Sequence, residues 1–204
     1  MASIGFTRED FEVFEIPTFP ERMQGIKEHV RPKLTALGED LQPALKRLAN
    51  GDVFPHVAKH ARRTVNPPPE TWVAFGPSAR GYKKYGYFGL VVSRGGIHTR
   101  IVVKDEAPDR QQMAKVLRER AGVLAKVFAK QTVSRYDRWD YHGIPELVKP
   151  TANFWQAVAE MLAKKTCGLD VGLGWPVDRA VTLTEKQVLE AFESLLPVYE
   201  ITRA

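Results

Sequence analysis

Residues 87–103, YFGLVVSRGGIHTRIVV, contain two short apolar runs separated by a turn-like tetrapeptide. The runs 87–92 and 97–103 are rich in valine, isoleucine and aromatic residues, which favour strands. Ser93-Arg94-Gly95-Gly96 is typical of a tight turn, because glycine tolerates positive φ angles. The stretch therefore predicts a β-hairpin.

Two further strands are predicted before this hairpin, at 53–60 and 71–75, and helices are predicted on either side of these strands in the sequence. Apolar residues at three- and four-residue spacing, or capping pairs such as Thr7 with Asp10 and Thr184 with Gln187, indicate helices near 7–14, 21–48, 109–130, 151–165 and 184–196. Pro32, Gly38 and Pro43 should break or bend the second of these into two or three helices, and Pro197 should end the last. The glycine-rich stretch 168–176 fits either a strand or an irregular crossing.

This order of elements predicts the fold class. Helices come first, then strands, then a helix, a loop and more helices. We therefore expect an α+β fold, a single compact domain (1–204) with a mainly antiparallel or mixed central sheet packed by N- and C-terminal helices. Its helical N-terminal part spans about 7–50, its sheet part about 53–104 and its helical C-terminal part about 109–202. The helix at 109–130 should cover one face of the sheet.

The composition is that of an ordered globular protein, with 204 residues of which 44% are hydrophobic. Its single cysteine, Cys167, excludes an intramolecular disulfide and a cysteine-based zinc cage, which favours a reducing compartment, the cytoplasm; we expect this thiol to be buried and inert. The sequence predicts neither export nor a membrane span. A formal net charge of +6 favours acidic partners.

Cations and rings gather in two segments. Residues 56–69 place two histidines and three cations before a proline run, which should form a stiff, extended connector. Residues 78–88 alternate tyrosines with cations, a pattern that suits stacking of a base beside a phosphate. A third mixed stretch, 135–143, could close over a ligand, with Asp140 or His142 transferring protons. Surface ion pairing is the plainer interpretation of the first and third stretches, and ordinary loop-to-strand composition is that of the second.

Familiar cofactor motifs are absent or incomplete. His56 and His60 are four residues apart, but a strand would separate them too widely to chelate a metal, and no glutamate lies between them. Residues 76–83 resemble a Walker loop with the lysine displaced and Lys84 where Ser or Thr should follow. The sequence therefore predicts no metal site and no cofactor.

The stretch HVAKHARRTVNPPPETWVAF (56–75), followed by RGYKKYGYF (80–88), resembles the signature of the YktB-like family of uncharacterised bacterial proteins. GFTREDFEVFEI (5–16) and RPKLTALGEDLQPAL (31–45) fit the N-terminal part of that family. The resemblance implies a compact α/β cytoplasmic domain and assigns no catalytic residue.

Three interpretations of the basic segments stay open. The first is a module that binds a phosphate-bearing ligand, a nucleotide or RNA. The second is an enzyme acting on a small anionic substrate, with His56, His60 or Asp140 handling protons. The third is a structural role without a ligand. The candidate ligand-binding residues are Lys59, His60, Arg62, Arg63, Asn66, Trp72, Arg80, Tyr82 and Lys83.

Overall fold

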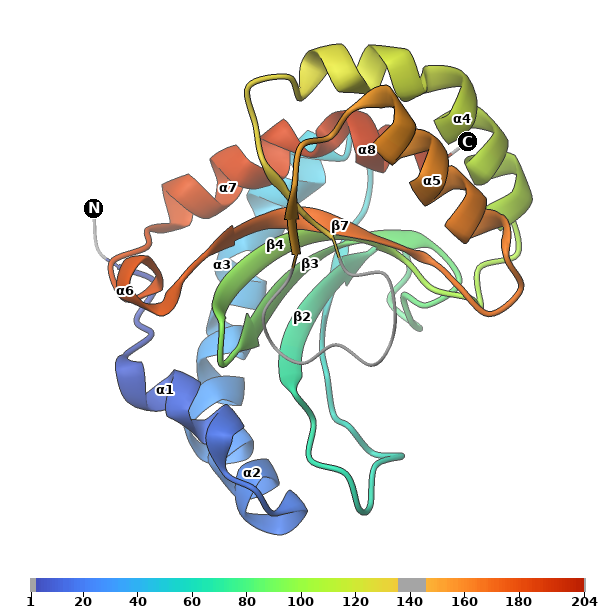
Figure 1. Ribbon diagram of the computed structural model, residues 1–204. Helices are drawn as coiled ribbons and strands as arrows, with labels where there is room; N and C mark the ends of the chain where they lie inside the picture. Colours follow the sequence, from blue (N-terminus) through green and yellow to red (C-terminus); the bar gives the residue numbers. More distant parts are fainter. Residues whose placement is uncertain (1–2, 136–145, 204) are drawn as a thin grey trace.

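In the computed structural model, which describes residues 3–135 and 146–203, strands form one curved sheet (Figure 1). Its strand order is β1-β2-β3-β4-β7-β5-β6, and every pairing between these strands is antiparallel. The strands are β1 (Phe54–Val57), β2 (Glu70–Gly76), β3 (Gly86–Ser93), β4 (Gly96–Val103), β5 (Val133–Arg135), β6 (Glu146–Val148) and β7 (Leu169–Trp175). The predicted α+β class with an antiparallel sheet is confirmed.

Strands β3 and β4 form the predicted hairpin. Ser93 pairs with Gly96 at its closed end, and Phe88 pairs with Ile101 further along. Gly96 has a φ of 121°, a conformation that residues with a Cβ rarely adopt. The turn chemistry in the sequence therefore sets the register of the two central strands.

The glycine-rich stretch 168–176 contains strand β7, which lies between β4 and β5. Gly172 lies opposite Arg100 and Gly174 lies opposite His98. A Cβ at Gly172 would collide with the carbonyl oxygen of Thr99, and one at Gly174 would collide with the His98 ring. These glycines let β7 approach β4 where that strand carries bulky polar side chains.

Helices pack on one face of the sheet. In Figure 1, α3 lies behind the strands, α7 lies above them on the left, and α4 and α5 form a pair above them on the right. Helix α3 contacts β1 and β2, α7 contacts β4, and α8 contacts β3. The helices are α1 (Arg8–Glu12), α2 (Phe19–Gly25), α3 (Arg31–Leu48), α4 (Arg110–Val127), α5 (Ala152–Ala163), α6 (Val177–Ala180), α7 (Glu185–Ser194) and α8 (Leu196–Ile201), with a 3₁₀ turn at Val13–Glu15 and a π-helical turn at Ile26–Val30.

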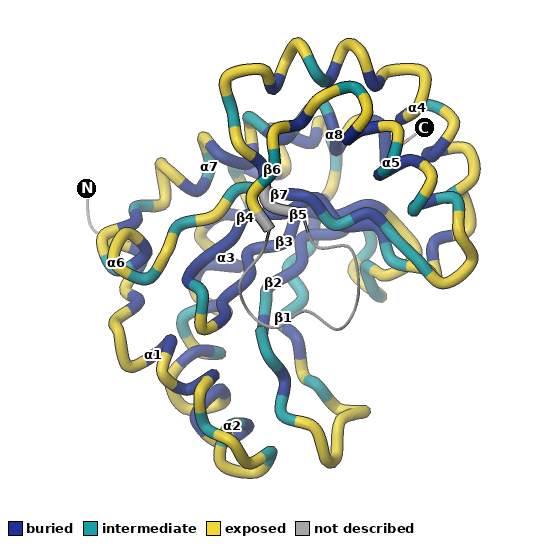
Figure 2. The backbone as a smooth tube through the Cα atoms, in the orientation of Figure 1, coloured by how far each residue is buried: buried dark blue, intermediate teal, exposed yellow. Residues whose placement is uncertain are grey.

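The two faces of the sheet differ in chemistry. Phe75, Phe88 and Leu90 point into the main apolar core on the helical face. The opposite face, which we call the polar face, carries Glu70, Trp72, Tyr87, His98, Arg100 and Asp170, by the alternation of side chains along paired strands. Every residue of β3 and β4 is buried, on the polar face as well as on the helical face (Figure 2).

The N-terminal helices differ from the prediction in where they break. The segment 21–48 is divided, as predicted, but Gly38 and Pro43 do not divide it: α3 contains both without ending, whereas Pro32 lies in its first turn. Burial of four leucines on one side of α3 outweighs the hydrogen bond lost at Pro43. Gly38 lets the helix approach the sheet, because a Cβ there would lie 3.1 Å from Cβ of Pro55. The interruption falls instead at the π-helical turn, between α2 and α3.

Two boundaries and one packing arrangement also differ from those predicted. The first strand ends at Val57 rather than at residue 60. Helix α4 packs mainly against α5 and α8, rather than covering the sheet itself. Pro197 lies in the first turn of α8, so it starts a second short helix after α7 has ended.

The two predicted capping pairs are confirmed. Thr7 donates its backbone N–H to Asp10 Oδ2 over 2.7 Å, and Thr184 donates its own to Gln187 Oε1 over 3.0 Å. In residues 3–135 and 146–203, no helix is long and apolar enough to cross a membrane.

Candidate anion-binding site

The basic segment after β1 forms a turn. The backbone N–H of Arg63 donates to the carbonyl oxygen of His60 over 3.0 Å, which closes the turn. Lys59, Arg62, Arg63 and Asn66 are all exposed on it. The three cations, Lys59, Arg62 and Arg63, thus lie at the surface without an ion pair among the described residues.

Two arginines of the N-terminal helices hold this segment in place. Arg22 donates from Nη1 to the carbonyl oxygen of Pro68 over 3.1 Å. Arg31 Nη2 lies 3.4 Å and 3.5 Å from the carbonyl oxygens of Ala58 and Lys59, within hydrogen-bonding reach. Residues 66–69 bend rather than form a strand, so helix contacts as well as prolines determine the path of the connector.

His60 is built into this arrangement. Its backbone has a φ of 53°, a left-handed conformation that is uncommon for a residue with a side chain. Its Nε2 lies 3.1 Å from Thr71 Oγ1, and its ring packs edge-on against Trp72 with 5.3 Å between ring centroids. Burial, with smaller contributions from Arg63 and Arg31, lowers the pKa of His60 to about 4. The imidazole is therefore neutral at pH 7.

A row of rings continues from His60 across the edge of the polar face. Trp72 Nε1 donates to Tyr82 Oη over 3.1 Å. The Tyr82 ring lies 5.4 Å from the His56 ring and 4.8 Å from the Tyr87 ring, measured between centroids. His56 Nε2 lies 2.9 Å from the carbonyl oxygen of Ser78, and since a carbonyl only accepts, this nitrogen donates. These ring contacts and hydrogen bonds hold the loop that follows β2 in position.

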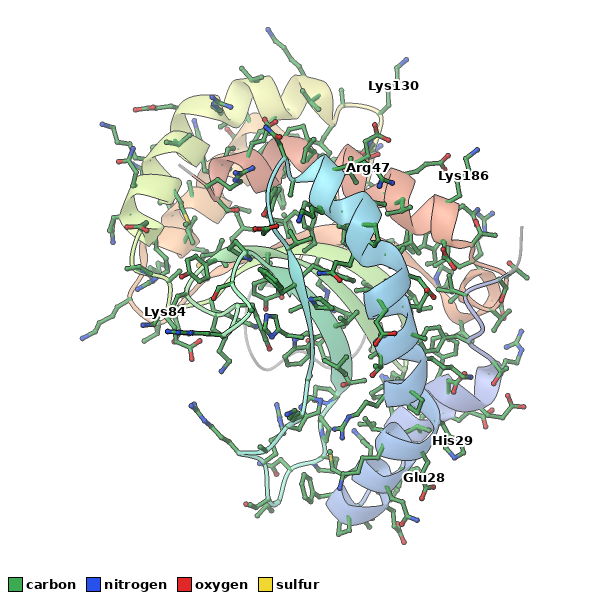
Figure 3. All side chains as sticks on the ribbon, turned by 180° about the vertical axis from the view of Figure 1, so that it is seen from behind. Glu28, His29, Arg47, Lys84, Lys130 and Lys186 are labelled. Atoms are coloured by element: carbon green, nitrogen blue, oxygen red, sulfur yellow. The ribbon has the colours of Figure 1, made fainter. Side chains whose placement is uncertain are left out.

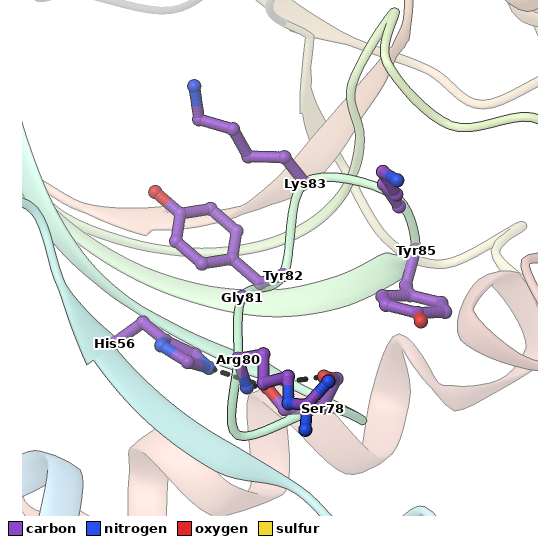
Figure 4. Close-up of a pocket in the computed structure, with 8 residues that line it drawn as sticks. His56, Ser78, Arg80, Gly81, Tyr82, Lys83 and Tyr85 are labelled. Atoms are coloured by element: carbon purple, nitrogen blue, oxygen red, sulfur yellow. Dashed lines mark hydrogen bonds between the residues drawn. The ribbon is translucent and has the colours of Figure 1, made fainter.

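That loop lines a partly open cavity of about 520 Å³, which we call the loop pocket (Figure 4). Its lining residues are His56, Ser78, Arg80, Gly81, Tyr82, Lys83, Lys84 and Tyr85. Three of them are cations, three are aromatic or imidazole rings, and none is acidic. The cavity is large enough for a small ligand.

The three cations of the loop pocket are placed differently. Lys83 pairs with Glu106 at 3.3 Å, an exposed pair of little energetic weight. Arg80 and Lys84 are exposed and have no carboxylate partner among the described residues. Figure 4 shows Lys83 and Arg80 extending in different directions from the loop, and Figure 3 shows Lys84 projecting outward. Ligand binding here would require these side chains to turn towards a common anion.

The predicted site residues thus separate into two groups. Arg80, Tyr82 and Lys83 line the loop pocket, whereas Lys59, His60 and Arg63 line a second cavity beside α2. Trp72 contacts a ring of each group. Arg62 and Asn66 line neither cavity.

Sequence reasoning missed a charged network on the polar face. Arg100, only 2% exposed, donates two hydrogen bonds to Glu70 and lies 3.5 Å from Asp170. Burial raises the pKa of Asp170 to about 6, although Arg100 and Lys104 oppose that shift. Lys104 Nζ lies 5.8 Å from the Trp72 ring centroid. The alternation of apolar and polar residues in IHTRIVV (97–103) is the signal that could have located Arg100.

Two further predictions concern residues outside these sites. Most of the stretch 135–143, including Asp140 and His142, lies outside the described residues. Cys167 is half-buried rather than buried as predicted, because it lies in the turn that leads into β7.

The fold and its sites define an α+β protein with one helix-covered sheet face, one polar face and two cation-lined cavities. The family model described as domain of unknown function (DUF1054) matches residues 6–199. A UPF0637 protein of Lysinibacillus sphaericus is 33% identical over 209 residues, covering 98% of this chain and 97% of the relative. One of Bacillus licheniformis is 30% identical over 100% of this chain and 98% of its own length.

The chain therefore belongs to the DUF1054 family, which confirms the resemblance to the YktB-like proteins. A UPF0637 protein of Bacillus velezensis is 42% identical over 126 residues, where the match spans 62% of this chain and 60% of that relative.

Proposed function

We propose that this protein binds a phosphate-bearing ligand in the loop pocket, and that the ligand is a nucleotide. One observation supports this most directly: three cations and two tyrosines line a cavity of about 520 Å³ whose lining contains no acid. Arginine and lysine supply charge-assisted donors to phosphate, and a tyrosine ring can stack on a base. A cavity of this size suits one nucleotide better than an extended strand of RNA.

The fixed parts of the pocket also support the proposal. Tyr82 is held by the Trp72 hydrogen bond, and its backbone lies so close to Gly76 that a Cβ there would approach Tyr82 Cβ to 2.6 Å. His56 holds the Ser78 carbonyl on the other side of the loop. A ligand would therefore meet one preformed ring, Tyr82, and would need to order the exposed side chains Arg80, Lys83, Lys84 and Tyr85. A cytoplasmic location, where nucleotides are abundant, is part of the same proposal.

The contacts of His60 favour a structural role for that residue over proton transfer. Its ring nitrogen is engaged by Thr71, its ring packs on Trp72, and its pKa is far below neutral. An imidazole with so low a pKa is a weak general base at pH 7. We therefore separate His60 from the ligand-binding groups of the loop pocket.

The test is titration calorimetry with ATP and with a short single-stranded RNA at several salt concentrations. An Arg80→Ala/Lys84→Ala variant should bind ATP at least about tenfold more weakly than the wild type, since two charge-assisted contacts are lost. A Lys126→Ala/Lys130→Ala variant, which removes the same charge from the end of α4, should bind like the wild type. If RNA binds and ATP does not, the nucleotide is the wrong ligand class; if both variants weaken binding equally, the pocket is not the site.

A further inference from the structure

The second cavity, of about 560 Å³, lies between α2 and the turn that follows β1, and we call it the α2 groove. Helix α2 and this turn lie at the same end of the molecule (Figures 1 and 3). The hydrogen bond from Arg22 of α2 to the Pro68 carbonyl ties the two walls together. No residue lines both the α2 groove and the loop pocket, so the two cavities are separate.

One wall of the α2 groove is apolar. Met23 is 6% exposed and belongs to the main core, and Phe19 is partly buried against the same core. Both residues also line the groove, so each has an edge facing the cavity. An apolar group placed against them would be removed from water at little structural cost, because the wall is already supported from behind.

The rim of the α2 groove is cationic. Lys27, Lys59 and Arg63 line it and are exposed, and none of the three has an ion pair among the described residues. The acid in the lining, Glu28, accepts a hydrogen bond from Gln24 over 3.0 Å. The groove therefore combines an apolar wall with an excess of positive charge at its mouth.

The groove is also preorganised. His60 lies in its wall as a neutral ring, locked by Thr71 and Trp72, with a backbone conformation that is costly for a residue with a side chain. The π-helical turn at Ile26–Val30 contributes Lys27 and Glu28, and such turns occur frequently at functional sites. Strained backbone and a π-turn on the two facing walls of one cavity point to a binding role.

We propose that the α2 groove is a second ligand site, for a phosphate monoester that carries an apolar group of several carbons. The apolar group lies against Phe19 and Met23, and the phosphate is held by Lys59 and Arg63 from the turn and Lys27 from the helix. This site is additional to the nucleotide site proposed for the loop pocket and does not depend on it.

Calorimetry with inorganic phosphate and with ethyl, butyl and hexyl phosphate tests both halves of the proposal. Affinity should rise along the series by about threefold to fourfold for each methylene that is buried. Hexylamine, with the same chain and the opposite charge, should not bind. A Lys59→Ala/Arg63→Ala variant should bind hexyl phosphate about tenfold to a hundredfold more weakly, since two charge-assisted contacts are lost.

The Arg80→Ala/Lys84→Ala variant is the matched control, because it removes two cations of the other cavity. It should bind hexyl phosphate like the wild type, while the Lys59→Ala/Arg63→Ala variant should keep its affinity for ATP. Failure of one site is thereby distinguished from failure of the other. Unchanged melting temperatures show that the variants fold.

Three results would overturn the proposal. Hexyl phosphate could bind no more tightly than inorganic phosphate, which would show that the groove does not bind the apolar group. Its binding could be lost in the Arg80→Ala/Lys84→Ala variant, which moves the ligand to the loop pocket. The protein could instead sediment with phosphatidic acid vesicles while binding no soluble hexyl phosphate, which makes a membrane surface, not a free phosphate monoester, the partner.

Discussion

The guanidinium of Arg100 and the carboxylate of Glu70 form two hydrogen bonds, Nη1 to Oε1 over 3.2 Å and Nη2 to Oε2 over 2.8 Å. Arg100 is 2% exposed, so this pair joins β2 to β4 in a region from which water is nearly excluded. A two-point contact of this kind fixes the orientation of both side chains. It links two strands that are separated by β3 in the sheet.

Glu70→Gln should lower the free energy of unfolding by about 3 kcal/mol. The substitution removes the negative charge that pairs with Arg100, so the Arg100 charge stays buried without it. Asp170→Asn should cost less than about 1 kcal/mol. Burial already disfavours the charged form of Asp170, and its Oδ1 has no hydrogen-bond partner among the described residues. Urea unfolding of both variants at neutral pH measures the difference. Equal losses would show that the two carboxylates contribute alike.

Acidification should lower the stability of the folded chain, because His60 is buried in its neutral form. Its pKa is about 4 in the folded chain, against the ordinary histidine value of 6.5, so between these values the unfolded chain binds a proton that the folded chain does not. The contribution of this group to stability is therefore complete above pH 6.5 and falls as the pH drops towards 4, by up to about 3 kcal/mol. His60→Asn tolerates the left-handed backbone and should remove this dependence. The free energy of unfolding of wild type and variant should be measured across this pH range. The same pH dependence in both proteins would contradict the prediction.

Asp170 should produce a pH dependence of opposite sign. Its pKa is about 6 in the folded chain, against the ordinary aspartate value of 3.8, so the folded chain retains a proton that the unfolded chain releases in this window. Stability from this group is present below pH 3.8 and is lost as the pH rises through 6. Relative to the wild type, the Asp170→Asn variant should lose more stability on acidification and the His60→Asn variant should lose less. Shifts of the same sign in both variants would refute the assignment.

The contributions of Trp72 and Tyr82 to stability should depend on each other, because the two side chains share a hydrogen bond. Trp72→Phe and Tyr82→Phe should each cost about 1 kcal/mol, and the double variant should cost clearly less than the sum. Trp72→Phe should also remove an interaction that lowers the pKa of the Tyr82 hydroxyl, and so raise that pKa further. A double-mutant cycle in urea and an ultraviolet titration of the tyrosines test the two statements separately. Strict additivity would mean that the bond contributes nothing.

Gly172→Ala should be among the most damaging single changes, costing at least about 2 kcal/mol, because a Cβ there meets the backbone of β4. Gly122→Ala, in helix α4 with open space around the new methyl group, is the matched control. It should stabilise the protein by about 0.5 to 1 kcal/mol through helix propensity. Thermal melts compare the two substitutions, and tolerance of alanine at Gly172 would mean that β7 can move away from β4.

The elements that the sequence predicts well are local. Strands β3 and β4 follow from their own composition and from the turn between them, and the Thr184 cap follows from a residue three positions away. Strand β7 remained ambiguous because its partner, β4, is far away in the sequence. Gly38 and Pro43 disfavour a helix locally, but they do not end α3, because its packing on the sheet outweighs that local preference.

In the candidate sites, too, the sequence predicts which neighbouring residues lie together but not which distant residues meet. Arg80, Tyr82 and Lys83 share a cavity because they are neighbours in one loop, so proximity in the sequence predicted proximity in space. Lys59 and Arg63 are predicted as ligand-binding residues together with these three, but they line the other cavity, beside α2. Arg100 and Glu70 come from different strands, and only the register of the sheet shows that they meet.

Chemical-shift mapping of the ¹⁵N-labelled protein during titration with ATP shows directly whether a nucleotide binds in the loop pocket. The amides of residues 78–85 and the ring of His56 should shift together with one dissociation constant, and the shifts should vanish in the Arg80→Ala/Lys84→Ala variant. Saturating ATP that leaves these resonances unmoved, or that shifts only residues remote from the loop pocket, would contradict the proposed nucleotide site.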